Sequence, residues 1–288
     1  MLRRSSGDPM ASMNDVVDPE LRAIHRAALS IYNRETAAIE AHPTPTASIN
    51  ATNFFAGQAA MFADAALLLM EDDRQPLNVP AALLRTCLEA QARSNHIIAV
   101  TGKERENRAS ELVQLMHLGH DYHEKLAIQL LKDFLADESK FLPRDRPYLP
   151  AMKSMARATD TSTLKALKKQ YESINRNWTY GKVAGRDKFG DPKSLHRSEA
   201  QPLQPALNLS YVQCCAFVHS DPASLKHGQL LTKIGVAHTI VLAELIAVSS
   251  FLVALGKEQD QELLNVKKRI IAFDANEKIL PKKDLPSC

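Results

Sequence analysis

Three features of the sequence predict an all-α fold, in which antiparallel helices form a bundle. Apolar residues make up 45% of the 288 residues and recur at helical spacing over long segments. The 15 prolines cluster between those segments, where they would end helices, and only 10 glycines are present. Alternating β-branched runs joined by Asn-Gly or Asp-Gly, the pattern typical of strands, are absent from the sequence. A chain of this length fits one large domain.

The expected domain is a single helical bundle over residues 18–275, with a disordered N-terminus at 1–17 and a charged tail at 276–288. The N-terminal segment is polar and lacks the apolar stretch of a signal peptide, which favours a cytoplasmic location. The four cysteines have no metal-ligand spacing and indicate free thiols in a reducing compartment. They are Cys87, Cys214, Cys215 and Cys288.

Helical periodicity and proline breaks divide the domain into its expected helices. Proline in the first turn favours the first of them, and the fourth is long for a globular protein. Pro143, Pro147 and Pro150 mark a corner. The expected helices are residues 19–41, 48–71, 80–100, 103–139, 162–176, 211–219, 228–255 and 257–275.

Two of these helices are apolar nearly all round, so both are expected at the centre of the bundle. In residues 48–71 the few polar side chains, Asn50, Asn53 and Asp64, share one arc and should face polar partners inside the bundle. The segment Ile234–Leu255 spans 22 residues and contains His238 and Glu244. A central carboxylate costs about 3 kcal/mol on membrane insertion, which favours a buried core helix. A membrane-tethered protein is the alternative.

The sequence predicts no cofactor and no metal site. His117, His120 and His123 recur at steps of three, but they spread over about 120° of a helix, too wide for one ion. His123 lies among apolar positions and is expected to be a core histidine. Glycine loops that cradle phosphates and serine-nucleophile elbows are absent from the sequence.

A basic stretch between Lys165 and Arg197 is the main charge asymmetry of the chain. The net charge of +3 does not by itself imply a polyanion partner. Within the irregular excursion at 177–205, basic and aromatic residues alternate, as on surfaces that bind nucleic acid. A soluble loop has the same composition. The candidate RNA-binding residues are Trp178, Lys182, Arg186 and Lys188.

The stretch Tyr211–Pro222 predicts a short helix that ends at His219, because Pro222 stops it. At a helix C-terminus the macrodipole favours protonated histidine, a suitable place for a titrating group. On the helix at 80–100, Arg85, Glu89, Arg93 and His96 form a polar ladder suited to ion pairing.

Three pieces of the sequence together resemble a known family. Leu83-Leu84-Arg85-x-x-x-Glu89, Trp178, and Tyr211 followed by His219-Ser220 resemble a bacterial family of uncharacterised all-helical proteins, which is similar to the HEPN superfamily of helical bundles. The resemblance implies that Arg85, Glu89, Tyr211 and His219 converge in the core. Many HEPN proteins are ribonucleases in which an arginine is followed by four to six residues and then a histidine.

This sequence departs from that ribonuclease motif, because Val212, Gln213 and Cys214 stand where the arginine would be. Arg85 could replace it in space, so the candidate catalytic residues are Arg85, Glu89, Tyr211 and His219. Three classes stay open: a HEPN-like protein, defence- or toxin-associated, that binds RNA or a protein partner; a metal-independent endoribonuclease; and the membrane-tethered protein. A homodimer is compatible with each.

Overall fold

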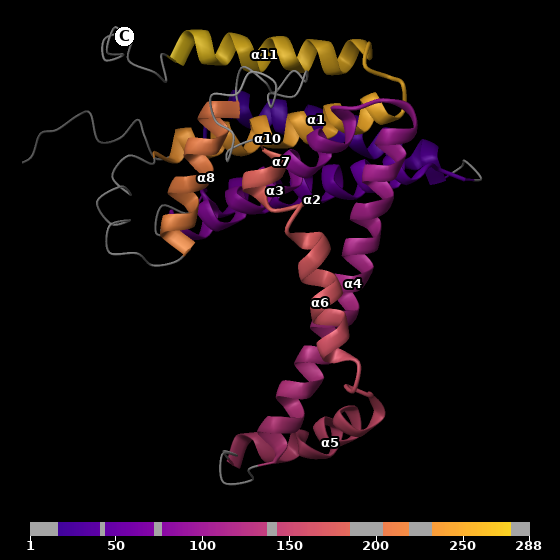
Figure 1. Ribbon diagram of the computed structural model, residues 1–288. Coiled ribbons are helices and arrows are strands. Elements are labelled where there is room, and N and C mark those ends of the chain that lie inside the picture. Colours follow the sequence, from indigo (N-terminus) through magenta and orange to yellow (C-terminus); the bar gives the residue numbers. More distant parts are fainter. Residues whose placement is uncertain are drawn as a thin grey trace, which may run out of the picture.

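The computed structural model describes residues 17–40, 44–71, 77–136, 143–184, 204–218 and 232–277. All regular structure in these ranges is helical, and the predicted all-α class is confirmed (Figure 1). The elements are α1 (Pro19–Glu40), α2 (Ala47–Leu69), α3 (Asn78–Ile98), α4 (Gly102–Leu135), the 3₁₀ helix η2 (Pro143–Tyr148), α5 (Leu149–Ala158), α6 (Leu164–Asn175), α7 (Tyr180–Val183), α8 (Gln204–Val218), α10 (Lys233–Ala254) and α11 (Gln261–Glu277).

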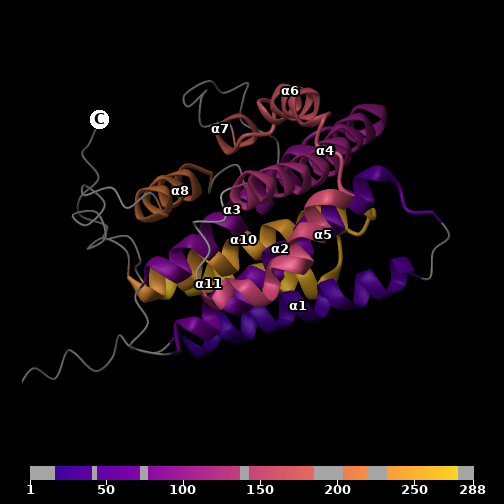
Figure 2. The same ribbon diagram turned by 90° about the horizontal axis from the view of Figure 1, so that it is seen from below.

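Helix α10 is the centre of the bundle, where it packs against α1, α2 and α3 (Figure 2). It is buried on nearly all sides, which explains why its sequence is apolar all round. Within the described ranges α10 alone is long and apolar enough to cross a membrane, and 78% of its most apolar window is buried inside the protein. The prediction of a buried central helix is therefore confirmed.

Small residues let α2 and α3 approach closely beside α10. Ala56, Ala59 and Ala63 on α2 are fully buried, as is Ala90 on α3. Short side chains at a helix contact reduce the distance between the axes. The first turn of α2 is fixed by Glu106 of α4, which accepts a hydrogen bond from the backbone N–H of Ser48 at 3.1 Å. A carboxylate at a helix N-terminus also interacts favourably with the helix dipole.

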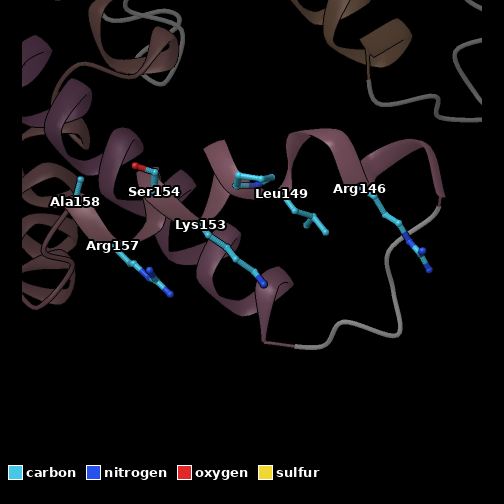
Figure 3. Close-up of a pocket in the computed structure, with 7 residues that line it drawn as sticks. Arg146, Leu149, Lys153, Ser154, Arg157 and Ala158 are labelled. Atoms are coloured by element: carbon cyan, nitrogen blue, oxygen red, sulfur yellow. The ribbon is translucent and has the colours of Figure 1, made fainter.

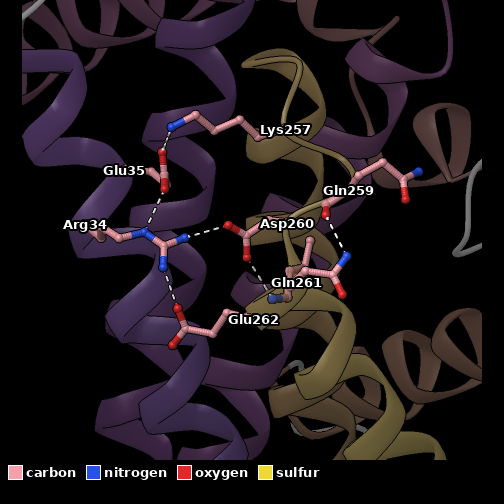
Figure 4. Close-up of polar contacts among 8 residues, drawn as sticks. Arg34, Glu35, Lys257, Gln259, Asp260, Gln261 and Glu262 are labelled. Carbon is pink, nitrogen blue, oxygen red and sulfur yellow. Dashed lines mark hydrogen bonds and ion pairs between the residues drawn. The ribbon is translucent and has the colours of Figure 1, made fainter.

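Ion pairs join α11 to α1 on the outside of the bundle (Figure 4). The Arg34 guanidinium donates to Glu35 and to Asp260, both at 2.8 Å, and it also pairs with Glu262. Lys257 pairs with Glu35 from the other side. Single exposed pairs stabilise little, but a connected set over two helices fixes their relative position better than isolated pairs do.

The far half of α4 leaves the bundle and forms an arm with η2, α5 and α6 (Figure 1). Helix α6 packs along α4, and α5 packs against α4 and η2 at the far end. Tyr171 stacks on Tyr122 with ring centroids 5.5 Å apart. At Gly119 an added Cβ would lie 3.1 Å from the Tyr171 ring, so glycine lets the two helices approach here.

The arm corrects two expectations. His123 was expected in the core, but it is exposed on the arm. Its ring lies edge-on to the Tyr171 ring, with centroids 5.5 Å apart, and is tilted relative to the Tyr122 ring, with centroids 5.0 Å apart. The apolar residues around His123 pack against a neighbouring helix of the arm, α6, and not against the bundle core. The expected proline corner contains η2 and α5, where Pro150 lies in the first turn of α5 and is compatible with a helix start.

Candidate functional site

The structure brings together three of the four candidate catalytic residues, on α3 and α8. Glu89 Oε1 accepts hydrogen bonds from Arg85 Nε at 3.2 Å and from the Tyr211 hydroxyl at 3.1 Å. The Arg85 guanidinium lies 5.7 Å from the centre of the Tyr211 ring, within the range of a cation–π contact. Arg93 Nη2 lies 4.0 Å from the second oxygen of Glu89. His219 lies outside the described residues.

Helix α7 supports this cluster from behind. The Tyr180 ring is stacked on the Tyr211 ring, with centroids 3.6 Å apart and planes 8° from parallel. The Tyr180 hydroxyl donates to Asn208 Oδ1 at 3.0 Å. Stacking and hydrogen bonding together fix the position of Tyr211, which in turn orients the carboxylate of Glu89.

Burial, reinforced by the nearby Glu89 carboxylate, raises the pKa of Tyr211, so its hydroxyl stays protonated and donates. Burial lowers the pKa of Arg85, but Tyr211, Cys215 and Glu89 outweigh that effect and raise it overall. Burial also raises the pKa of Cys214 to about 12, which makes this thiol a poor nucleophile. Cys87, Cys214 and Cys215 are free thiols, as predicted.

The candidate RNA-binding residues do not form one exposed surface. Trp178 is only 1% exposed, and its ring packs edge-on against His96, with centroids 5.2 Å apart. The expectation of an RNA-stacking tryptophan is therefore wrong, because this large apolar ring seals α7 against α3. Lys182 is exposed. Arg186 and Lys188 lie outside the described residues.

Within the part of the chain that the structure describes, no group of three or more His, Cys, Asp or Glu residues could hold a metal ion. His120 is 76% exposed, and its Nδ1 lies 3.6 Å from Asp121. His117, His120 and His123 all belong to α4.

A second cluster, which the sequence did not predict, lies where α1, α2 and α10 meet. His25 Nδ1 lies 2.7 Å from Glu244 Oε2, and His25 Nε2 lies 3.3 Å from Asp64 Oδ1. The Glu244 side chain is 0% exposed, that of His25 is 5% exposed and that of Asp64 is 65% exposed. The three residues thus connect the centre of the bundle to its surface.

Electrostatics in this cluster favour a charged histidine. Burial raises the pKa of Glu244 to about 7, against the opposing effect of His25. Burial also lowers the pKa of His25, but its contacts with Glu244 and Asp64 outweigh that effect and raise it overall. On α3, burial raises the pKa of Cys87, whose thiol donates to the Ala59 carbonyl at 3.4 Å. The sequence contained one indication of this cluster: Asp64 and Glu244 are isolated carboxylates in two helices that are otherwise apolar.

A groove of about 640 Å³ lies over α1 and α2, and Asp64 is part of its wall. Its polar and aromatic lining is Tyr32, Asn50, Asn53, Phe54, Gln58 and Asp64. The polar residues Asn50, Asn53 and Asp64 therefore do lie on one side of α2, as predicted, but they face this groove instead of the bundle interior. The groove meets the His25 cluster at Asp64.

A second concavity, of about 720 Å³, lies along α5 at the end of the arm. Arg146, Lys153 and Arg157 line it, and their side chains project to the same side (Figure 3). Leu149 lies between them. This surface is basic and open.

Comparisons with known proteins assign no family to this chain. No family model, no curated protein and no solved structure matches it.

Replacement of Glu89 tests the cluster on α3 and α8. The side chains of Arg85 and Glu89 are 27% and 25% exposed, so the cluster is less buried than the sequence suggested. We expect Glu89→Ala to lower the free energy of unfolding by about 1–2 kcal/mol, because water partly solvates the separated Arg85. Glu104→Ala, which removes an exposed pair with Arg108, is the control for urea denaturation. A loss as small as in the control would argue against the contact with Tyr211.

The buried Glu244 predicts a pH dependence of stability. Its pKa is about 7 in the folded protein against 4.5 for an ordinary glutamate, so the folded state binds the proton more tightly. Stability from this group is full below pH 4.5 and is lost as the pH rises through 7. We expect a loss of about 3 kcal/mol between about pH 5 and 8, and a much smaller loss in Glu244→Gln.

Urea denaturation at several pH values measures this difference. Glu172→Gln, on the surface of α6, is the matched control and should retain the wild-type slope. Parallel pH profiles for wild type and Glu244→Gln would contradict the prediction.

Proposed function

We propose that this protein binds RNA through its arm. The observation that carries this proposal is the segregation of charge. Residues 146–184 contain eight basic and two acidic residues, a net charge of +6 in a chain whose total is +3. The rest of the chain is therefore net negative. Seven of the eight basic residues lie between Arg146 and Arg176, on η2, α5 and α6 and their connections, which project from the bundle (Figure 1). Lys182 belongs to α7, which packs on α3, and the α4 side of the arm also carries the acidic residues Asp121, Glu124 and Asp133. A clustered basic surface attracts the phosphate backbone of a nucleic acid.

The positions of the basic side chains support contact with a backbone. Arg146 of η2 and Lys153 and Arg157 of α5 project to one side (Figure 3). Arginine and lysine side chains at intervals along a helix can each contact a different phosphate. A helical turn rises about 5.4 Å, close to the spacing of successive phosphates in an extended strand.

Helix α6 continues the basic surface toward the bundle. Lys165, Lys168 and Lys169 are all exposed. Lys168 Nζ is 3.8 Å from Glu172 Oε1, an exposed pair that contributes little and that a phosphate could replace. The exposed Lys182, near the bundle end of the arm, extends the same series.

An exposed aromatic side chain favours RNA with unpaired bases as the ligand. Tyr148 is 63% exposed at the start of α5, next to the basic concavity. Bases stack on exposed aromatic rings in proteins that bind single strands, and each stacked base contributes about 1–3 kcal/mol. Tyr148 offers the ring that the buried Trp178 cannot offer.

Fluorescence anisotropy with a labelled single-stranded RNA tests the proposal. We expect Lys165→Glu/Lys168→Glu/Lys169→Glu to bind at least tenfold more weakly than wild type, because three cations become anions. The slope of log K against log salt should also become shallower by about 2 for single-stranded RNA. Tyr148→Ala should weaken binding several-fold with no change in this slope.

The matched control is Arg26→Glu/Lys103→Glu/Lys268→Glu, which changes the net charge equally on exposed positions of the bundle. Equal losses in the two triple variants would show attraction by total charge alone and would overturn the arm as the binding surface. Anionic phospholipid vesicles are a second ligand. Binding to the vesicles with no binding to RNA would overturn the proposal.

A second candidate function is metal-independent RNA cleavage, which the contact among Arg85, Glu89 and Tyr211 favours. In this proposal the fold is HEPN-like, Arg85 holds the scissile phosphate and His219 moves a proton at the ribose hydroxyl. Glu89 orients Arg85. The competing explanation is a buried polar network that fixes helix register without chemistry.

RNA cleavage in the presence of EDTA tests this candidate. We expect His219→Ala to lose cleavage at least a hundredfold while it retains RNA binding, because the proton transfer is lost and the arm is unchanged. Cleavage by His219→Ala at the wild-type rate, or none by wild type, would overturn the catalytic candidate and leave the binding proposal intact.

A further inference from the structure

The groove over α1 and α2 differs in chemistry from the basic arm. Its volume of about 640 Å³ falls within the range of small-molecule sites in proteins. Asp64 is the only charged residue among the described residues that line it. The remaining lining combines amide side chains with the rings of Tyr32 and Phe54.

This lining suits a positively charged organic ligand. A cation is attracted by a carboxylate and also by the faces of aromatic rings, and each attraction grows as water is excluded. The amides of Asn50 and Gln58 can orient such a ligand through hydrogen bonds. An anionic ligand would find no positive side chain among the lining residues, so charge complementarity selects the cation.

Asp64 is held in place from behind. Its Oδ1 lies 3.3 Å from His25 Nε2, and His25 Nδ1 lies 2.7 Å from the fully buried Glu244. A carboxylate fixed by a buried partner loses less conformational entropy on binding than a free surface side chain does. Asp64 has two oxygens, and this contact leaves Oδ2 for a ligand.

Gly57 shapes the wall next to Asp64. An added Cβ at Gly57 would lie 2.4 Å from the Tyr32 hydroxyl, so the absence of a side chain lets the Tyr32 ring lie against α2. Tyr32 also contacts Phe251 of α10, with ring centroids 6.0 Å apart. The aromatic wall is thus supported by the core.

We propose that this groove is a binding site for a small organic amine, with Asp64 as the counter-ion of its ammonium group. The Tyr32 and Phe54 rings contact the apolar part of the ligand. The site is separate from the arm and does not depend on RNA binding.

The buried pair behind Asp64 makes amine binding depend on pH. With Glu244 ionised and His25 protonated, the three side chains carry a net charge of −1, and protonation of Glu244 reduces it to zero. The groups that face Glu244 are His25 from α1, Asp64 from α2 and Cys87 from α3, whose thiol burial keeps neutral. Amine affinity is therefore higher above pH 7 than below it.

The test uses benzylammonium as the probe and uncharged benzyl alcohol as its matched control. Titrations of the full-length protein are followed by two-dimensional amide NMR, which reports the side-chain amides of Asn50, Asn53 and Gln58. We expect saturable shifts of these signals with benzylammonium and at least tenfold weaker binding of benzyl alcohol. Asp64→Asn should weaken benzylammonium binding at least tenfold, and Asp121→Asn on the arm should not change it.

The pH dependence is tested by comparing the affinity for benzylammonium at about pH 6 and pH 8, where the amine stays mostly protonated. We expect about three- to tenfold tighter binding at the higher pH for wild type. Glu244→Gln should lose this difference; its thermal melt reports whether it is folded. Because Asp64 is 65% exposed, Asp64→Asn should fold normally.

Three results would overturn the proposal. The first is the absence of saturable shifts up to the solubility limit of benzylammonium. The second is equal affinity of wild type and Asp64→Asn for the probe. The third is equal binding of benzylammonium and benzyl alcohol, which would show that the groove binds the apolar ring and that Asp64 does not act as a counter-ion.

Discussion

The pairing of Glu244 with His25 is the constraint on which the bundle depends. A carboxylate in the middle of an apolar helix cannot be buried alone, because an unpaired buried charge costs several kcal/mol. Its partner comes from a helix 219 residues earlier in the sequence. A shift of α10 by one residue would rotate Glu244 by about 100° and separate this pair. The contact therefore selects one rotation and one register of the central helix.

The bundle and the arm differ in how much of their surface is buried. The bundle buries many large apolar side chains around α10, and polar contacts such as His25 with Glu244 and Arg34 with Asp260 fix the relative positions of its helices. In the arm, α6 packs along α4, where Tyr122 stacks on Tyr171 beside Gly119, and α5 packs against α4 and η2; few residues of the arm are buried. Its other faces are open, and η2, α5 and α6 present basic side chains on them. The bundle thus fixes the positions of its helices, and the arm leaves most of its surface accessible to solvent.

The two polar clusters differ in how much of each could be predicted from the sequence. Arg85 and Glu89 are one turn apart, so their pairing follows from helical spacing, and the resemblance to a helical family added Tyr211. His25 could not be paired with Glu244 in this way, since neither spacing nor a motif relates them. The polar arc of α2 was recognised, but the side of the helix that faces solvent depends on which neighbours cover it. Trp178, between α6 and α7, was expected on an RNA-binding surface but is buried against His96, which lies 82 positions earlier in the chain.

The sequence by itself determined the helical class, most helix boundaries and the central position of α10, because these depend on local periodicity, on proline and glycine and on the hydrophobicity of one segment. Tertiary structure alone decided that α4 extends beyond the bundle, that His123 is exposed and that Asp64 meets His25. These depend on contacts between segments far apart in the chain. Periodicity specifies that a face is apolar, but it does not specify which helix, or how much of the core, will cover that face.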